Sequence, residues 1–413
     1  MRRQNLWKAI IAVTATLGTA ATNADFIDDS QVQLKLKNFY LDRQIKDNPA
    51  GNWGSWSQGV TLDAKSGYHD IGAGIQVGAD LLVQHAFKLN ARDKNADFIL
   101  PHDGKESKDN FGKVGATLKA KVSQTELKIG ELLPVSPVLV FDPSRQLLTT
   151  FGGAWLESKE IKDTKLTLAY IDSINNRYDN QFRGLTKFAP PAYDNGAEAD
   201  GMWIAGVDHQ FTPEIGGSYW YADVQDIYTQ HYVGTSYKTK LGEKAKLDSH
   251  VRYFDNSESG DKLYGEIDNQ ALSVGAKVNY GSHTVGLSYQ QMFGDSAFPT
   301  LGGWVPQPYL ANWGVATFTN ADEKSYGLTY GYDFSELGAK GLNATAVYMI
   351  GKDATFRGVK NQDSDELNLI VNYTVPEGKL KGLGVQAMYI DADFDYKSDL
   401  QEYRTAVTYS YKF

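Results

Sequence analysis

The chain has 413 residues, with 41 basic and 50 acidic side chains, a net charge of −9, and no cysteine. The acidic balance argues against nucleic acid as a partner, and the lack of thiols excludes disulfides and thiolate metal sites. Beyond the N-terminal segment there is no apolar stretch of about 18 residues, which excludes helical membrane spans. The abundance of Gly, Tyr and Phe fits instead a closed antiparallel β-barrel.

The first 24 residues have the pattern of a secretory signal peptide. Three basic residues flank the start of an apolar run from Ala9 to Ala21, and a small-residue cleavage site ends at Ala24. The run is too short to cross a bilayer as a helix, which disfavours an uncleaved anchor. We therefore expect a signal peptide over 1–24 and a channel domain over 25–413, exported to the outer membrane of a Gram-negative cell.

The first predicted strand, near residues 31–37, alternates with a period of two. Val32, Leu34 and Leu36 fall on one face, which suits lipid, whereas polar and basic side chains including Lys37 fall on the other. Arg43 shares the parity of Lys37. In a membrane barrel the polar face lines the lumen, so both cations are expected to point inward.

Similar alternating segments recur along the whole chain, separated by eight short connections and nine longer, more polar stretches. Seventeen connections give eighteen strands with both ends in the periplasm, and sixteen strands is the alternative. A soluble propeller or tandem sandwich is disfavoured because no repeat beyond the hairpin is visible. The longer stretches lie near residues 44–55, 88–110, 134–152, 173–200, 222–227, 255–267, 294–323, 351–364 and 392–401.

The third longer stretch is too apolar to remain in solvent. From Pro134 to Leu148 it combines three prolines with a run of Val, Leu and Phe residues. We expect it to fold into the barrel, pack on the wall and narrow the pore, with Arg145 at the narrowest point and Asp142 nearby. The alternative is that Arg145 is a structural anchor that pairs with a carboxylate of the wall.

The last twelve residues alternate most clearly, with aromatic residues on one face up to the terminal Phe413 and Arg404 on the other. The first and last strands are neighbours when a barrel closes, so Lys37, Arg43 and Arg404 should face one another across the seam. Guanidinium groups bind carboxylates in a forked geometry, and a column of cations would attract and pass on an anion. The alternative is that these charges only keep the lumen hydrated and do not select solutes.

Several segments resemble the OprD family of substrate-specific outer-membrane porins, also called Occ channels. The match begins at Phe26-Ile27-Asp28-Asp29-Ser30 and continues through LKLKNFYLDR, which ends at Arg43. Trp56-Ser57-Gln58-Gly59 looks like the family's second-strand motif. The stretch from Lys128 through Arg145 to Gly153 is similar to its constriction-loop segment. The resemblance covers residues 26–413.

This resemblance implies an eighteen-stranded barrel with an inward third loop and a basic ladder on the wall. It implies passage of amino acids, aromatic acids and, in some members, carbapenem antibiotics. Arg43 and Arg145 match eyelet and ladder positions, Arg404 matches a ladder arginine, and Tyr193 is a plausible eyelet tyrosine. The chain departs from the family at Gln386 and Met388, where two inward arginines are frequent, so a shorter ladder is expected.

We therefore predict a porin for passive, substrate-selective diffusion of small carboxylates, and not an enzyme. The alternative is a channel for neutral or mixed solutes such as short chitin-type oligosaccharides, since a chitin branch exists in the same superfamily. The seven histidines are scattered without a catalytic motif, and no cofactor or metal is expected. Expected partners are small solutes, outer-membrane lipid and lipopolysaccharide, and both monomer and trimer remain open.

Overall fold

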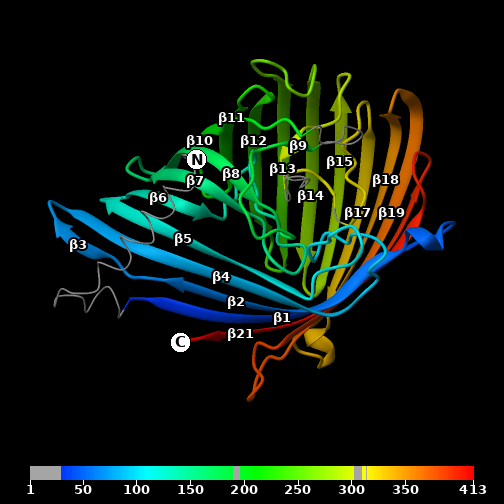
Figure 1. Cartoon of the computed structure of the whole chain (residues 1–413), viewed down its shortest axis with the longest axis horizontal. Coiled ribbons are helices and arrows are strands. Elements are labelled where there is room, and N and C mark those ends of the chain that lie inside the picture. The colour runs from blue at the N-terminus through cyan, green and yellow to red at the C-terminus, as the bar shows by residue number, and fades with distance from the viewer. Residues whose placement is uncertain (1–28, 189–195, 302–308, 313) are drawn as a thin grey trace.

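The structure is a computed structural model that describes residues 29–188, 196–301, 309–312 and 314–413. Long antiparallel strands, each hydrogen-bonded to the next in chain order, curve around one lumen (Figure 1). The last strand pairs with the first, from Gln33 opposite Lys412 to Ile45 opposite Leu400, and this pairing closes the barrel. In the described part of the chain, no helix is long and apolar enough to cross a membrane.

Eighteen strands make up the wall within the described residues, which confirms the predicted count over the alternative of sixteen. They are β1 (Gln31–Ile45), β2 (Trp53–Lys65), β4 (Ile75–Ala91), β5 (Asn110–Val122), β6 (Thr125–Leu132), β7 (Thr150–Ser158), β8 (Thr164–Asn175), β10 (Met202–Gln210), β11 (Ile215–Val224), β12 (Tyr228–Leu241), β13 (Ala245–Glu258), β14 (Asp268–Tyr280), β15 (His283–Phe293), β17 (Lys324–Asp333), β18 (Leu342–Phe356), β19 (Val359–Thr374), β20 (Gly384–Phe394) and β21 (Leu400–Lys412).

Five short elements lie in the connections. They are β3 (His69–Gly72), β9 (Lys187–Phe188), β16 (Thr300–Leu301), and the 3-10 turns η1 (Pro49–Gly51) and η2 (Phe334–Leu337). β3 pairs with the start of β4 and lies in the turn that follows β2, whereas β9 and β16 pair with each other and join two long loops. All eight predicted short connections lie between the expected strands.

One predicted connection, between β18 and β19, is much shorter than expected. The stretch 351–364 is almost entirely strand, because β18 continues to Phe356 and β19 begins at Val359. Its charged residues, which suggested a loop, form cross-strand ion pairs instead. Lys352 pairs with Asp363 at 2.6 Å, and Asp353 pairs with Lys324 at 2.9 Å. A register shift after Gly351 accommodates these polar residues in a hairpin.

The two faces of the wall differ as the alternation predicts, with one exception. Apolar side chains such as Val114 and Leu168 are exposed on the outer face, where lipid would cover them. Along β7 to β14, however, large apolar residues also point inward. Trp220, Tyr232 and Phe254 are buried there, in one apolar cluster with residues of the third loop (residues 133–149) and of the described parts of the seventh loop (residues 294–301, 309–312 and 314–323). This apolar cluster lies across the lumen from the seam between β1 and β21.

Candidate functional site

The third loop is fastened to β1, β4 and β5. The Lys37 ammonium donates a hydrogen bond to the carbonyl of Arg145. The backbone N–H of Leu148 donates to Gln84 Oε1 at 2.9 Å, and Lys113 Nζ donates to the Leu148 carbonyl at 2.6 Å. The strand register places these three wall side chains on one face, the face opposite the exposed apolar residues. The loop therefore contacts the polar side of the wall.

Asp142 is buried and serves as the partner of a cation from another loop. Its carboxylate forms an ion pair with Arg177 Nη1 and also accepts a hydrogen bond from the N–H of Ser144 at 2.7 Å. Arg177 in addition donates through Nε to the carbonyl of Phe98 at 3.2 Å, and its N–H donates to Thr149 Oγ1 at 3.2 Å. Arg177 thus joins the second, third and fourth long loops, a role that the sequence did not reveal.

Arg145 is a buried cation with few hydrogen-bond partners for its guanidinium group. Its Nη1 donates to the carbonyl and the hydroxyl of Ser144, both at 3.3 Å, and within the described residues its Nε has no hydrogen-bond partner. Burial lowers the pKa of Arg145 well below its usual range, and the nearby Arg404 and Arg177 lower it further. Among the described residues no carboxylate forms an ion pair with Arg145, so the wall-anchor alternative has no support in the contacts.

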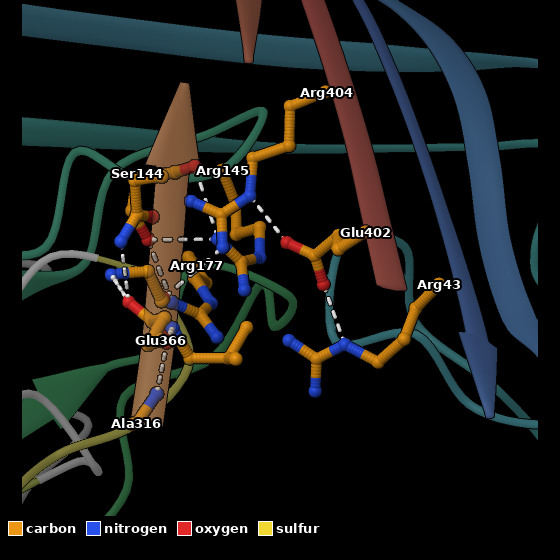
Figure 2. A network of polar contacts seen from close by, with 11 residues as sticks. Arg43, Ser144, Arg145, Arg177, Ala316, Glu366, Glu402 and Arg404 are labelled. Atoms are coloured by element: carbon orange, nitrogen blue, oxygen red, sulfur yellow. Dashed lines mark hydrogen bonds and ion pairs between the residues drawn. The ribbon is translucent and has the colours of Figure 1, made fainter. Parts of the chain in front are cut away.

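The seam brings Arg43 and Arg404 together through Glu402 (Figure 2). Arg43 Nε donates to Glu402 Oε2 at 2.5 Å, and Arg404 Nε donates to Glu402 Oε1. Glu402 is completely buried between the two arginines, and the Arg43 guanidinium also lies 4.2 Å from the ring of Trp53. The sequence predicted that the two arginines face each other, but not that a carboxylate links them.

A second carboxylate holds the seventh loop at the same place. Glu366 of β19 accepts hydrogen bonds from the backbone N–H groups of Gly314 at 2.8 Å, Val315 at 2.7 Å and Ala316 at 2.6 Å. Arg404 Nη2 donates to the carbonyl of Gly314 at 3.2 Å. Sequence reasoning missed Glu366, although its parity, opposite to that of the outward Leu367 and Leu369, could have placed it in the lumen.

Three further positions complete the comparison with the prediction. Tyr193 lies outside the described residues. Met388 pairs with Arg404 across β20 and β21, and Gln386 pairs with Ala406, so both share the face of Arg404 as expected. Gln386 donates to Asn372 Oδ1 at 2.8 Å. In the part of the chain that the structure describes, no group of three or more His, Asp or Glu side chains could hold a metal ion.

Comparison with known proteins agrees with this architecture. The family model of the OprD outer membrane porins matches residues 24–413. Porin-like protein GalP of Pseudomonas putida is 28% identical over 91% of this chain and 90% of its own length, and Porin D of Pseudomonas aeruginosa is 27% identical over 98% of each.

The solved structures of Pseudomonas aeruginosa OccK9 (OpdG) and of OpdK with vanillate superpose with TM-scores of 0.90 and 0.87. Their sequences are 32% and 30% identical to this one, over 94% of this chain and 100% of each of theirs. Since the family model spans nearly the whole sequence and the solved members share the barrel, this chain belongs to the OprD family of outer membrane porins.

Proposed function

We propose that the barrel passes small carboxylate-bearing solutes by passive, substrate-selective diffusion, and that Lys37, Arg43, Arg145 and Arg404 line its narrowest part. Amino acids, aromatic acids and carbapenem-type antibiotics belong to this class of solute. In this proposal the third loop narrows the lumen, and Arg145 faces the seam. The observation that carries it is that Glu402 binds both Arg43 and Arg404, while Arg145 lies near Arg404 without an ion pair among the described residues (Figure 2).

The charge balance at this place opposes that of the whole chain. Four arginines (Arg43, Arg145, Arg177 and Arg404) face three carboxylates (Asp142, Glu366 and Glu402), which leaves an excess of one positive charge. Charges in a confined, partly desolvated passage are screened much less than charges in open water. Such a passage favours anions although the protein carries a net charge of −9.

A carboxylate also fits the free hydrogen-bonding capacity of these groups. A guanidinium offers five N–H donors in a planar fork that matches the two oxygens of a carboxylate. Only part of this capacity is used by Arg145, whose buried Nε is unpartnered within the described residues. One solved relative, OpdK, is described with vanillate, which is itself an aromatic carboxylate.

The alternative of neutral or mixed solutes rests on Gln386 and Met388. Both share the face of Arg404 on the neighbouring strand, and neither carries a charge. The cationic column therefore does not extend onto β20 at these two positions. We expect a modest preference for anions for this reason, and not a steep one.

Single-channel recording in planar bilayers, with carboxylates and neutral sugars of matched size, tests the proposal. Arg404→Ala should lower the carboxylate-to-neutral flux ratio by up to about tenfold, the value of a lost charge-assisted hydrogen bond, with little change in pore width. Arg145→Ala should lower the same ratio and raise the conductance.

Arg183→Ala is a matched control, because Arg183 is an exposed arginine bound to Asp179 of its own loop. It should leave both quantities unchanged. If Arg145→Ala and Arg404→Ala behave like this control, the cationic mechanism is wrong and the neutral-solute alternative takes its place.

A further inference from the structure

A second group of polar and aromatic side chains lies on the wall across from the seam. It lines a cavity of about 1320 Å³ that is bordered by the inner face of β10 to β15, by residues 159–165 at the β7–β8 turn, and by residues 309–312 of the seventh loop. The strand order places β11 and β12 halfway around the barrel from β1 and β21. The cavity is therefore separate from the Arg43–Glu402–Arg404 site and lies toward the end of the barrel with the short turns.

Two glycines shape the floor of this cavity. A Cβ atom at Gly234 would lie 2.1 Å from the hydroxyl of Tyr232, and one at Gly275 would lie 2.5 Å from the imidazole of His250. Each glycine therefore makes room for an aromatic ring that lies along the wall. Gly234 is also the direct cross-strand partner of Arg252, so the space it leaves adjoins that guanidinium.

Arg252 projects from this floor among aromatic rings. Its guanidinium carbon lies 5.5 Å from the centre of the Tyr309 ring. Tyr309 in turn meets Tyr232 edge to face, with ring centres 5.8 Å apart and an interplanar angle of 82°. Arg252 and Tyr309 are both half-buried and both line the cavity. A cation and an aromatic ring thus line the same space.

The cavity is also cationic as a whole. Six basic and four acidic side chains line it, an excess of two positive charges in a chain with a net charge of −9. Two of the acids already have basic partners, since Asp208 lies 3.2 Å from Lys165 and Asp248 lies 3.6 Å from Lys238. The charge that remains for a solute is positive.

We infer that this cavity is a second solute subsite, which takes a planar aromatic ring bearing a carboxylate. Arg252 binds the carboxylate, and Tyr309 packs against the ring. The inference rests on the proposed function, because it assigns the same class of solute to a second place in the lumen. This subsite requires that the solute carry an aromatic ring, whereas the cationic site at the seam requires only a carboxylate.

Equilibrium binding of 4-fluorobenzoate to the purified full chain, followed by ¹⁹F NMR, tests the inference. Arg252→Gln should weaken binding to this subsite by about tenfold, and Arg252→Lys, which keeps the charge, should weaken it less. Tyr309→Leu should weaken binding of 4-fluorobenzoate more than binding of trifluoroacetate, which has no ring. Heat-modified migration of each variant on gels shows that the barrel has folded.

The control Arg183→Gln removes an arginine outside this cavity and should leave binding unchanged. The inference is overturned if Arg252→Gln binds 4-fluorobenzoate like this control, or if Tyr309→Leu weakens binding of trifluoroacetate as much as binding of 4-fluorobenzoate. Arg404→Ala, measured in the same assay, reports on the seam. If Arg404→Ala weakens binding and Arg252→Gln does not, the proposed function stands without this subsite. If Arg252→Gln weakens binding and Arg404→Ala does not, this subsite stands without the seam site.

Discussion

Glu402 is the carboxylate that links the two arginines of the seam. It is fully buried and accepts hydrogen bonds from both Arg43 and Arg404. Alternation in the sequence places all three residues on the inner face, and this much could be predicted. The linkage could not, because it depends on the register by which β21 meets β1 and sets Arg43 opposite Glu402.

The charge of Glu402 can be removed with little change in shape. Glu402→Gln should raise the carboxylate-to-neutral flux ratio, because two arginines would then share no anion. It should also lower the temperature at which the barrel unfolds on gels, since removing one partner of a buried ion pair costs about 3–5 kcal/mol.

Glu377→Gln is the control for this prediction, because Glu377 is exposed in the turn between β19 and β20. It should alter neither the flux ratio nor the unfolding temperature. An unchanged flux ratio in Glu402→Gln would show that the seam arginines do not act on the solute.

At the scale of elements, the third and seventh loops differ in how well their contacts with the wall can be predicted from the sequence. The prolines and apolar residues of the third loop predicted that it packs on a surface, whereas its fold into the pore stays a prediction. The attachment of the seventh loop was not predicted, because Glu366 binds backbone N–H groups from Gly314 to Ala316, and such groups occur in every residue except proline. The contact between Asp142 and Arg177 was missed because it joins two separate loops.

A second buried carboxylate, at the end of the seventh loop, contacts the wall at β19. Glu323 is completely buried and accepts hydrogen bonds from the N–H and the side-chain amide of Asn320 in the same loop, at 2.9 and 2.8 Å. It also accepts a hydrogen bond from the hydroxyl of Ser364 on β19, at 3.5 Å. Burial raises the pKa of its carboxyl from 4.5 to about 7, although the bonds from Asn320 and the charge of Lys397 act in the opposite direction. The folded state therefore holds this proton more tightly than the unfolded state, and the attachment is strongest when Glu323 is neutral.

We predict that this attachment weakens as the pH rises from about 4.5 through about 7, the interval between the two pKa values. Open-channel current noise should increase over this interval, and Glu323→Gln should remove most of the dependence. Burial lowers the pKa of Lys397 only to about 8, so that group titrates above the interval. Noise that rises equally in Glu323→Gln would assign the effect to another group.

At the scale of the whole molecule, the strand count was the most predictable property. Each hairpin shows its alternation and its turn locally, so the count needs no knowledge of how distant segments meet. The apolar cluster inside β7 to β14 was not predicted, since inward residues were expected to be polar. Trp220 and Phe254 are buried in one cluster with loop residues, and this burial depends on contacts that only the assembled barrel makes.

The boundaries of the mature molecule follow from its N-terminal pattern. We expect the protein in the outer membrane to begin at Asp25 and to migrate differently on gels before and after heating, as closed barrels do. Mass spectrometry of the membrane-extracted protein checks the first point. Retention of residues 1–24 in that form would contradict the signal-peptide prediction.

The pairing of β1 with β21 has a consequence for biogenesis. Arg43 and Glu402 are 359 positions apart in the chain, on its first and last strands. Every other strand can be in place while these two edges are still open, and the seam site does not exist in that state. Under the proposed function, selectivity would therefore arise only when β1 pairs with β21. A barrel in which this pairing is incomplete would pass solutes without selection.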